Sequence, residues 1–172
     1  MNNKQSLNLV WMDMEMTGLD VGMEYILEIA TIVTDSELNI LEEGPSLVIH
    51  QSDEVLNRMD EWNRTHHTAS GLLQRSKESG ITVAEAERQT VEFIKKYCPP
   101  NTSPLCGNSV GQDRKFLEKY MVGPSKYLHY RTIDVTTIKE LVRRWFPDGP
   151  KFPKKSETHL ALIDVRESLQ EL

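Results

Sequence analysis

The sequence predicts one α/β domain over residues 1–172, with a mixed central sheet flanked by helices. Apolar, strand-like runs fill the first third of the chain, and segments with helical periodicity follow them. Hydrophobic residues make up 38% of the 172 residues, which is enough for one substantial core. No repeat, low-complexity tract or linker divides the chain, so a single folding unit is expected.

The first element is a strand within residues 7–18, stopped by Thr17 and Gly18. Its apolar residues occupy both parities, which is typical of a central strand covered on both faces. Two more strands are expected at residues 25–34 and 38–50, with a turn at residues 35–37 between them.

Helices dominate the rest of the predicted chain. Helical patterns and stop signals, such as the Pro99-Pro100 pair, place helices at residues 53–62, 69–77, 83–97, 111–120 and 135–145, and from about residue 159 to the end. Short strands are expected at residues 104–107 and 130–133, and residues 146–155, rich in Pro, Gly and Lys, form a loop.

Charge and composition limit the function. The formal net charge is −6, so a broad basic surface for long nucleic acids is excluded. No apolar segment has membrane-spanning length and no signal peptide is recognised, so no membrane partner is expected. Cys98 and Cys106 form no ligand motif, and we interpret them as reduced thiols of a cytoplasmic protein.

Asp13 and Glu15 are the most informative residues. They are separated by one residue at the end of the first strand, so both side chains leave the same face, about 7 Å apart at their bases. Two ionised carboxylates at the edge of an apolar core repel each other and lose hydration. A divalent metal ion is the simplest group that would offset this cost.

Three further residues could complete such a site. Asp113 falls in the first turn of a predicted helix, where N-capping alone would explain an acid. Asp164 and His159 are five residues apart, about 140° around a regular helix, so His159 must come from the helix start or the loop before it. Taken singly, a histidine is more often a surface or satisfied residue, and an aspartate on a helix is usually solvated.

Together these residues resemble a known family. Asp13 with Glu15, Asp113 behind residues 108–110, and His159 with Asp164 are similar to the three motifs of the DEDDh class of 3′–5′ exonucleases. Within that class the chain resembles the oligoribonuclease family, through longer motifs at residues 11–19, 67–72, 106–109, 129–135 and 166–168. The resemblance covers nearly the whole chain and implies a ribonuclease H-like fold.

The resemblance also implies a mechanism. Asp13, Glu15, Asp113 and Asp164 would hold two divalent metal ions, and His159 would be the general base that takes a proton from the attacking water. Oxygen ligands without a thiolate favour Mg²⁺ or Mn²⁺ over zinc. The implied substrates are short single-stranded RNA oligonucleotides, especially dinucleotides, cleaved to 5′-mononucleotides.

Substrate contacts are implied at seven positions. Leu19 would wedge between bases, Trp62 would stack on one, and His67 would contact the phosphate near the cleavage point. Ser109, Arg131 and Thr136 would grip the 5′ phosphate, and Tyr130 would reach that site from the second subunit of a homodimer. The alternatives are core packing for Leu19, Trp62 and Tyr130, a surface or helix-capping role for His67, and a salt bridge for Arg131.

Two positions depart from the family pattern. Ile163 stands where the family often has a second Asp beside Asp164, and there packing is expected to change while catalysis survives. The final helix is shorter than in the family, which could weaken the dimer or loosen Asp164. Two other functions share the fold: a proofreading-type DNA exonuclease of the same class, and a catalytically silent nucleic-acid-binding module.

Overall fold

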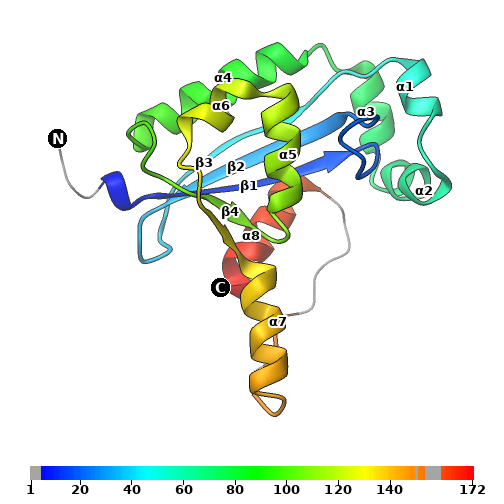
Figure 1. The fold of residues 1–172 in the computed structure, drawn as a ribbon. Coiled ribbons are helices and arrows are strands. Elements are labelled where there is room, and N and C mark those ends of the chain that lie inside the picture. Colours follow the sequence, from blue (N-terminus) through cyan, green and yellow to red (C-terminus); the bar gives the residue numbers. More distant parts are fainter. Residues whose placement is uncertain (1–4, 150, 154–159) are drawn as a thin grey trace.

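The structure, a computed structural model, describes residues 5–149, 151–153 and 160–172. A five-stranded sheet forms the centre of this part of the chain, in the order β3-β2-β1-β4-β5 (Figure 1). The strands are β1 (Leu9–Met16), β2 (Ile26–Thr34), β3 (Ile40–Val48), β4 (Leu105–Gly107) and β5 (Thr132–Asp134). β1 pairs antiparallel with β2 and parallel with β4, so the sheet is mixed, as predicted.

Helices cover both faces of the sheet (Figure 1). On one face, α4 (Val83–Tyr97), α5 (Gly111–Tyr120) and α6 (Val122–Tyr127) enclose a core that includes Met12, Ile29 and Phe116. On the other face, α8 (Ala161–Glu171) packs its Ala161 and Val165 against a cluster that contains Trp11. The prediction that the first strand is buried on both sides is therefore confirmed.

Three short helices follow β3 and differ from the predicted boundaries. They are α1 (Asp53–Asn57), α2 (Glu61–Ala69) and α3 (Leu72–Glu78). A single helix at residues 53–62 was wrong, because the Asp60 side chain accepts a hydrogen bond from the Asn63 backbone N–H at 2.8 Å and begins α2. Trp62 consequently lies in the first turn of α2.

The predictions for α4, α5 and α7 (Val135–Trp145) were confirmed to the residue, but α6 was not predicted. Its Gly123 and Pro124 read as helix breakers, yet a proline in the first turn costs no internal hydrogen bond. α7 follows β5 directly and extends away from the sheet (Figure 1).

One glycine sets the spacing between two strands. A Cβ at Gly107, the last residue of β4, would lie 2.8 Å from the carbonyl oxygen of Met12 in β1. A side chain at this position would push β4 away from β1, so glycine is required here.

In the part of the chain that the structure describes, no helix has the length and apolar character needed to cross a bilayer.

Candidate active site

Asp13 and Glu15 lie on β1 with their side chains on the face that α8 covers. The alternation of β1 places Trp11, Asp13 and Glu15 on one side, and Trp11 packs against α8. Across the antiparallel pair, Asp13 stands opposite Ala30 and Glu15 opposite Glu28. The acid pair therefore faces the first turn of α8.

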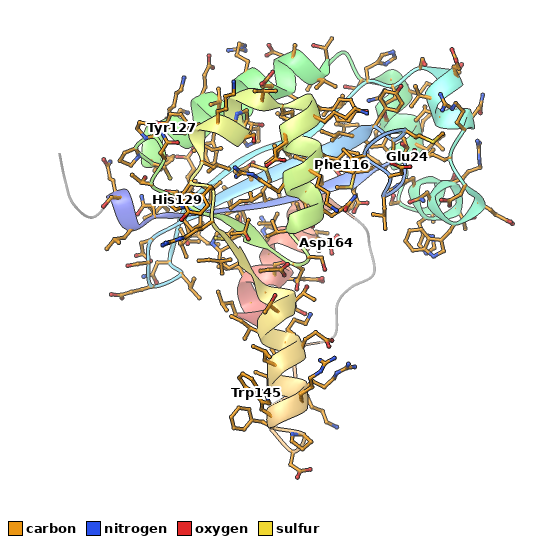
Figure 2. The ribbon with its side chains drawn as sticks, viewed as in Figure 1. Glu24, Phe116, Tyr127, His129, Trp145 and Asp164 are labelled. Atoms are coloured by element: carbon orange, nitrogen blue, oxygen red, sulfur yellow. The ribbon has the colours of Figure 1, made fainter. Side chains whose placement is uncertain are left out.

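Asp164 comes from that first turn and completes a cluster of three carboxylates. One oxygen from each of Asp13, Glu15 and Asp164 lies within 4.8 Å of the other two. Asp164 is fixed by its backbone, whose N–H donates to the Leu160 carbonyl at 3.1 Å, and the helix N-terminus favours an acid there. Figure 2 labels Asp164 on α8, below the sheet.

Glu15 carries the electrostatic cost of this arrangement. Burial, together with the nearby charges of Asp164, Glu28 and Asp113, raises the pKa of Glu15 from 4.5 to about 8. A carboxyl group with such a pKa holds its proton near neutral pH unless a cation lies close to it.

Asp113 is buried beside the cluster but is not one of its three members. Its Oδ1 accepts a hydrogen bond from the Met14 backbone N–H at 2.9 Å, and burial raises its pKa to about 7. The N-capping alternative was wrong, because the N-cap of α5 is Val110 and no side chain caps that helix end. Asp113 is instead attached to β1 between the two acids that β1 carries.

Glu28 is a buried acid of the site that sequence reasoning missed. Its carboxylate pairs with Arg75 at 3.2 Å and accepts a hydrogen bond from the Ala161 backbone N–H at 3.3 Å. It therefore connects β2 to the start of the helix that carries Asp164. A charged residue inside the otherwise apolar run of residues 26–34 was the signal that could have identified it.

His67 lies behind Glu15 rather than on the surface. It is 2% exposed, its Nε2 lies 2.9 Å from the Met16 carbonyl oxygen, and its Nδ1 lies 4.0 Å from Glu15 Oε2. A carbonyl oxygen only accepts, so Nε2 carries the proton. The surface alternative was wrong. His159, the expected general base, lies outside the described residues.

Leu19 and Trp62 are both exposed, which excludes core packing. Leu19 is 74% exposed on the loop after β1, and Gln112 of α5 donates a side-chain hydrogen bond to its carbonyl oxygen. Trp62 is 59% exposed and stacks on His66, with ring centroids 3.9 Å apart. Two apolar groups are thus presented to solvent by elements that adjoin the acids.

Two of the three residues expected to hold a 5′ phosphate, Ser109 and Thr136, lie together where β4 and β5 end, whereas Arg131 precedes the start of β5. The Ser109 backbone N–H donates to Thr136 Oγ1 at 2.9 Å, and the two hydroxyl oxygens are 3.2 Å apart. Ser109 has a positive φ of 50°, a conformation uncommon outside glycine that is over-represented at binding sites. The structure therefore brings Ser109 and Thr136 together.

Arg131 and Tyr130 are exposed neighbours just before β5. The Arg131 guanidinium carbon lies 5.5 Å from the Tyr130 ring centroid, and Tyr130 is 72% exposed. Core packing of Tyr130 is therefore excluded. Within the described residues, Arg131 forms no ion pair with a carboxylate, so the salt-bridge alternative was wrong too.

The acidic cluster suits a hard divalent cation. Its ligand atoms are carboxylate oxygens, with no thiolate among them, which is the donor set that Mg²⁺ and Mn²⁺ prefer. A cation among these oxygens would also stabilise the ionised form of Glu15, which burial and the neighbouring carboxylates disfavour. Both cysteines are free, buried thiols, as predicted.

Comparison with known proteins gives the same family at the level of sequence. An exonuclease family model, RNase_T, matches residues 10–172. An oligoribonuclease of Pseudomonas putida is 57% identical over 172 residues, covering 100% of this chain and 94% of the relative. The oligoribonuclease of Shewanella amazonensis is 57% identical over 165 residues, covering 96% and 91%.

Solved structures agree on the fold. Exonuclease I from Methylocaldum szegediense superimposes with a TM-score of 0.71 at 20% identity, over 94% of this chain and 38% of that one. The zinc-bound complex of Escherichia coli exonuclease I with single-stranded DNA gives a TM-score of 0.73 at 16% identity, over 94% and 38%. The chain thus spans about two fifths of the length of these proteins, and the ribonuclease H-like fold is confirmed.

Proposed function

Because this chain belongs to the oligoribonuclease family of exonucleases and hydrolyses phosphodiester bonds of short RNA from the 3′ end, we propose that it acts above all on dinucleotides. The observation that carries the proposal is the cluster of Asp13, Glu15 and Asp164 carboxylates within 4.8 Å. The chain is proposed to act as one domain, because the family match spans residues 10–172.

The metal ligands are the first part of the proposal. Asp13, Glu15 and Asp164 would hold a divalent cation, and Asp113, buried next to β1, would complete a site for two Mg²⁺ or Mn²⁺ ions. When bound, such ions stabilise charge at the phosphorus and lower the pKa of the attacking water. Glu15 must be ionised to serve as a ligand, and the nearby cations would keep it so.

Proton transfer is assigned to His159. Its position one residue before Leu160, the N-cap of α8, supports this role, because α8 also carries Asp164 into the acidic cluster. An unperturbed imidazole has a pKa of about 6.5 and accepts a proton readily near neutral pH. His67, with its Nε2 against the Met16 carbonyl and its Nδ1 4.0 Å from Glu15 Oε2, is assigned to the phosphate near the cleavage point.

Base binding is assigned to the two exposed apolar groups. Leu19 would separate the two bases, and Trp62 would stack on one of them without regard to its identity. The loop that carries Leu19 is held by α5, through Gln112 and through Lys119, which donates to the Val21 carbonyl at 2.6 Å. Stacking of this kind suits an enzyme that degrades RNA of any sequence.

The 5′ phosphate is assigned to Ser109, Arg131 and Thr136. Arg131 offers a planar guanidinium with several N–H donors, which suits a forked contact with phosphate. Ser109 and Thr136 at the ends of β4 and β5 would close off the substrate near the acids on β1, and Arg131 would have to reach them from the start of β5. A short substrate with its own 5′ phosphate would occupy the metal site and the 5′ phosphate site at the same time.

We also propose a homodimer in which Tyr130 reaches the 5′ phosphate site of the second subunit. In support, Tyr130 is largely exposed, and Val135 alone is buried among the residues of α7. Trp145 is 66% exposed near the far end of α7 and points away from the sheet (Figure 2). Exposed apolar groups along one projecting helix are typical of a surface that another chain covers.

The free, buried cysteines support a cytoplasmic location.

The deciding assay uses 5′-labelled RNA and DNA of two to about twenty nucleotides, with Mn²⁺ or with a chelator. We expect RNA dinucleotides to be cleaved with much the highest kcat/KM, and no cleavage with chelator. Length-independent digestion of DNA would instead support a proofreading-type exonuclease. Binding without products would support a silent nucleic-acid-binding module, and either result would overturn the proposal.

A further inference from the structure

Asn108 lies at the centre of a hydrogen-bond network that joins the end of α8 to the proposed phosphate site. Its Nδ2 donates to Ser168 Oγ and to Glu171 Oε2, both at 2.7 Å, and its Oδ1 accepts from Thr136 Oγ1 at 3.1 Å. Glu171 also pairs with Lys139 of α7, and its side chain is 3% exposed. This partly buried network has no part in the metal chemistry described above.

The orientation of the Asn108 amide is fixed by its partners. A carboxylate that is paired with Lys139 only accepts hydrogen bonds, so the amide nitrogen must face Glu171. Ser168 gives its own proton to the Asp164 carbonyl at 2.8 Å, so it too accepts from Asn108. The amide oxygen must therefore point toward Thr136.

This orientation determines where the Thr136 proton points. Since Asn108 Oδ1 only accepts, the Thr136 hydroxyl donates its single proton to Asn108. The same Thr136 oxygen accepts from the Ser109 backbone N–H at 2.9 Å. Thr136 is then only an acceptor toward the Ser109 hydroxyl, 3.2 Å away, so Ser109 is the one of the two hydroxyls whose proton can be redirected to a ligand.

We propose that Asn108 and Glu171 are positioning residues that fix the proton of Thr136 and so make Ser109 the hydroxyl donor to the 5′ phosphate of the substrate. The inference rests on the proposed phosphate site and deepens it. A phosphate oxygen only accepts, so with the Thr136 proton committed to Asn108 the Ser109 hydroxyl is the one that can donate to it, by turning from Thr136 Oγ1. The network also connects the last turn of α8 to the proposed phosphate site.

The test compares a dinucleotide that carries a 5′ phosphate with the same dinucleotide that lacks it. The measured quantity is the ratio of the two kcat/KM values. Asn108→Ala should lower this ratio roughly tenfold, as expected for the weakening of one hydrogen bond to a charged group. Gln170→Ala, an exposed neighbour of Glu171 on α8, is the matched control and should leave the ratio unchanged.

A double-mutant cycle separates positioning from general damage. Thr136→Val removes the hydroxyl through which Asn108 acts, so adding Asn108→Ala to Thr136→Val should lower the ratio no further. If Asn108→Ala fails to fold, Glu171→Gln tests the same hydrogen-bond network. A glutamine amide can either donate or accept, so it no longer forces the Asn108 nitrogen to face residue 171. It should lower the ratio by less than Glu171→Ala does.

The outcomes distinguish this inference from the proposed function. An unchanged ratio in Asn108→Ala and Glu171→Gln, or an equal loss on both substrates, would overturn the positioning role. If Arg131→Ala lowers the ratio at the same time, the phosphate site itself stands. If Arg131→Ala also leaves the ratio unchanged, the 5′ phosphate is not held here and the proposed site is wrong.

Discussion

The carboxylate of Asp113 accepts the backbone N–H of Met14 at 2.9 Å, so an acid from α5 is attached to the strand between Asp13 and Glu15. The contact joins residues 99 positions apart in the sequence and lies wholly in the interior. It fixes the separation of α5 and β1 at the active site. Asp113 is therefore a structural residue as well as a proposed ligand, and the two roles can be separated by substitution.

Asp113→Asn should abolish activity while the fold survives. An asparagine oxygen still accepts from Met14, but a neutral amide is a poor ligand for Mg²⁺ or Mn²⁺. Asp113→Ala should in addition lower the free energy of unfolding by about 1–3 kcal/mol, because the Met14 N–H would be left buried without an acceptor. Urea unfolding and turnover of an RNA dinucleotide measure the two effects. Normal turnover by Asp113→Asn would remove Asp113 from the metal site.

The stability of the metal-free protein should fall as the pH rises. The pKa of Glu15 is about 8 in the folded state against an ordinary value of 4.5, so between these values the folded state binds more protons than the unfolded state. This contribution is fully present below about pH 4.5 and is lost progressively as pH rises through 8, with a total on the order of a few kcal/mol.

The check is a series of thermal unfolding curves in chelator between about pH 5.5 and 8.5. Glu15→Gln cannot ionise, so its Tm should depend less steeply on pH than that of the wild type. Asp113, whose pKa is raised to about 7, leaves a residual dependence of the same sign. Equal slopes for wild type and Glu15→Gln would contradict the raised pKa.

Divalent metal should stabilise the protein through the acidic cluster. At about one hundred times the dissociation constant, Mn²⁺ would add about 2.7 kcal/mol to the free energy of unfolding, and so raise Tm by roughly 5–10 °C. Asp13→Asn should lose most of this shift together with activity. Calorimetric titration counts the ions bound, and a stoichiometry of one in the absence of substrate would leave the second ion to be supplied with the RNA.

Leu19→Ala and Trp62→Ala should weaken substrate binding without weakening the fold. Both side chains are exposed, and one stacking contact contributes about 1–3 kcal/mol, so KM for a dinucleotide should rise by roughly 5- to 150-fold. Met23→Ala is the control, because Met23 is an exposed apolar residue of the same loop as Leu19. A KM unchanged in both variants would show that the bases bind elsewhere.

Trp145→Glu should dissociate the proposed dimer. A charge on the exposed apolar side of α7 would have to be buried in the interface, whereas Leu7→Glu introduces the same charge at an exposed residue outside α7. Light scattering gives the mass of each variant. A dimer unaffected by Trp145→Glu would place the interface away from the end of α7.

Much of the site was predictable because carboxylate side chains at characteristic positions indicate a metal site from the sequence alone. Asp13 and Glu15 on one strand face require only the alternation of a strand, and the clustering with Asp164 followed from the motifs. By contrast, Glu28 and Glu171 gave no motif, because a buried acid is recognised only by the partners that fold around it. The break before α2 and the helix α6 depend on single capping and tertiary contacts, which the local pattern does not contain.

Gly107 has a consequence for the length of RNA that the enzyme selects. The proposed cleavage point lies at the end of β1 and the proposed 5′ phosphate site at the ends of β4 and β5, so hydrogen-bonded strands, about 4.8 Å apart, separate the two. The missing side chain of Gly107 lets β4 take that spacing from β1. In the proposed function, the spacing of the backbone strands would therefore set the distance between the two sites, and with it the length of substrate that fits both.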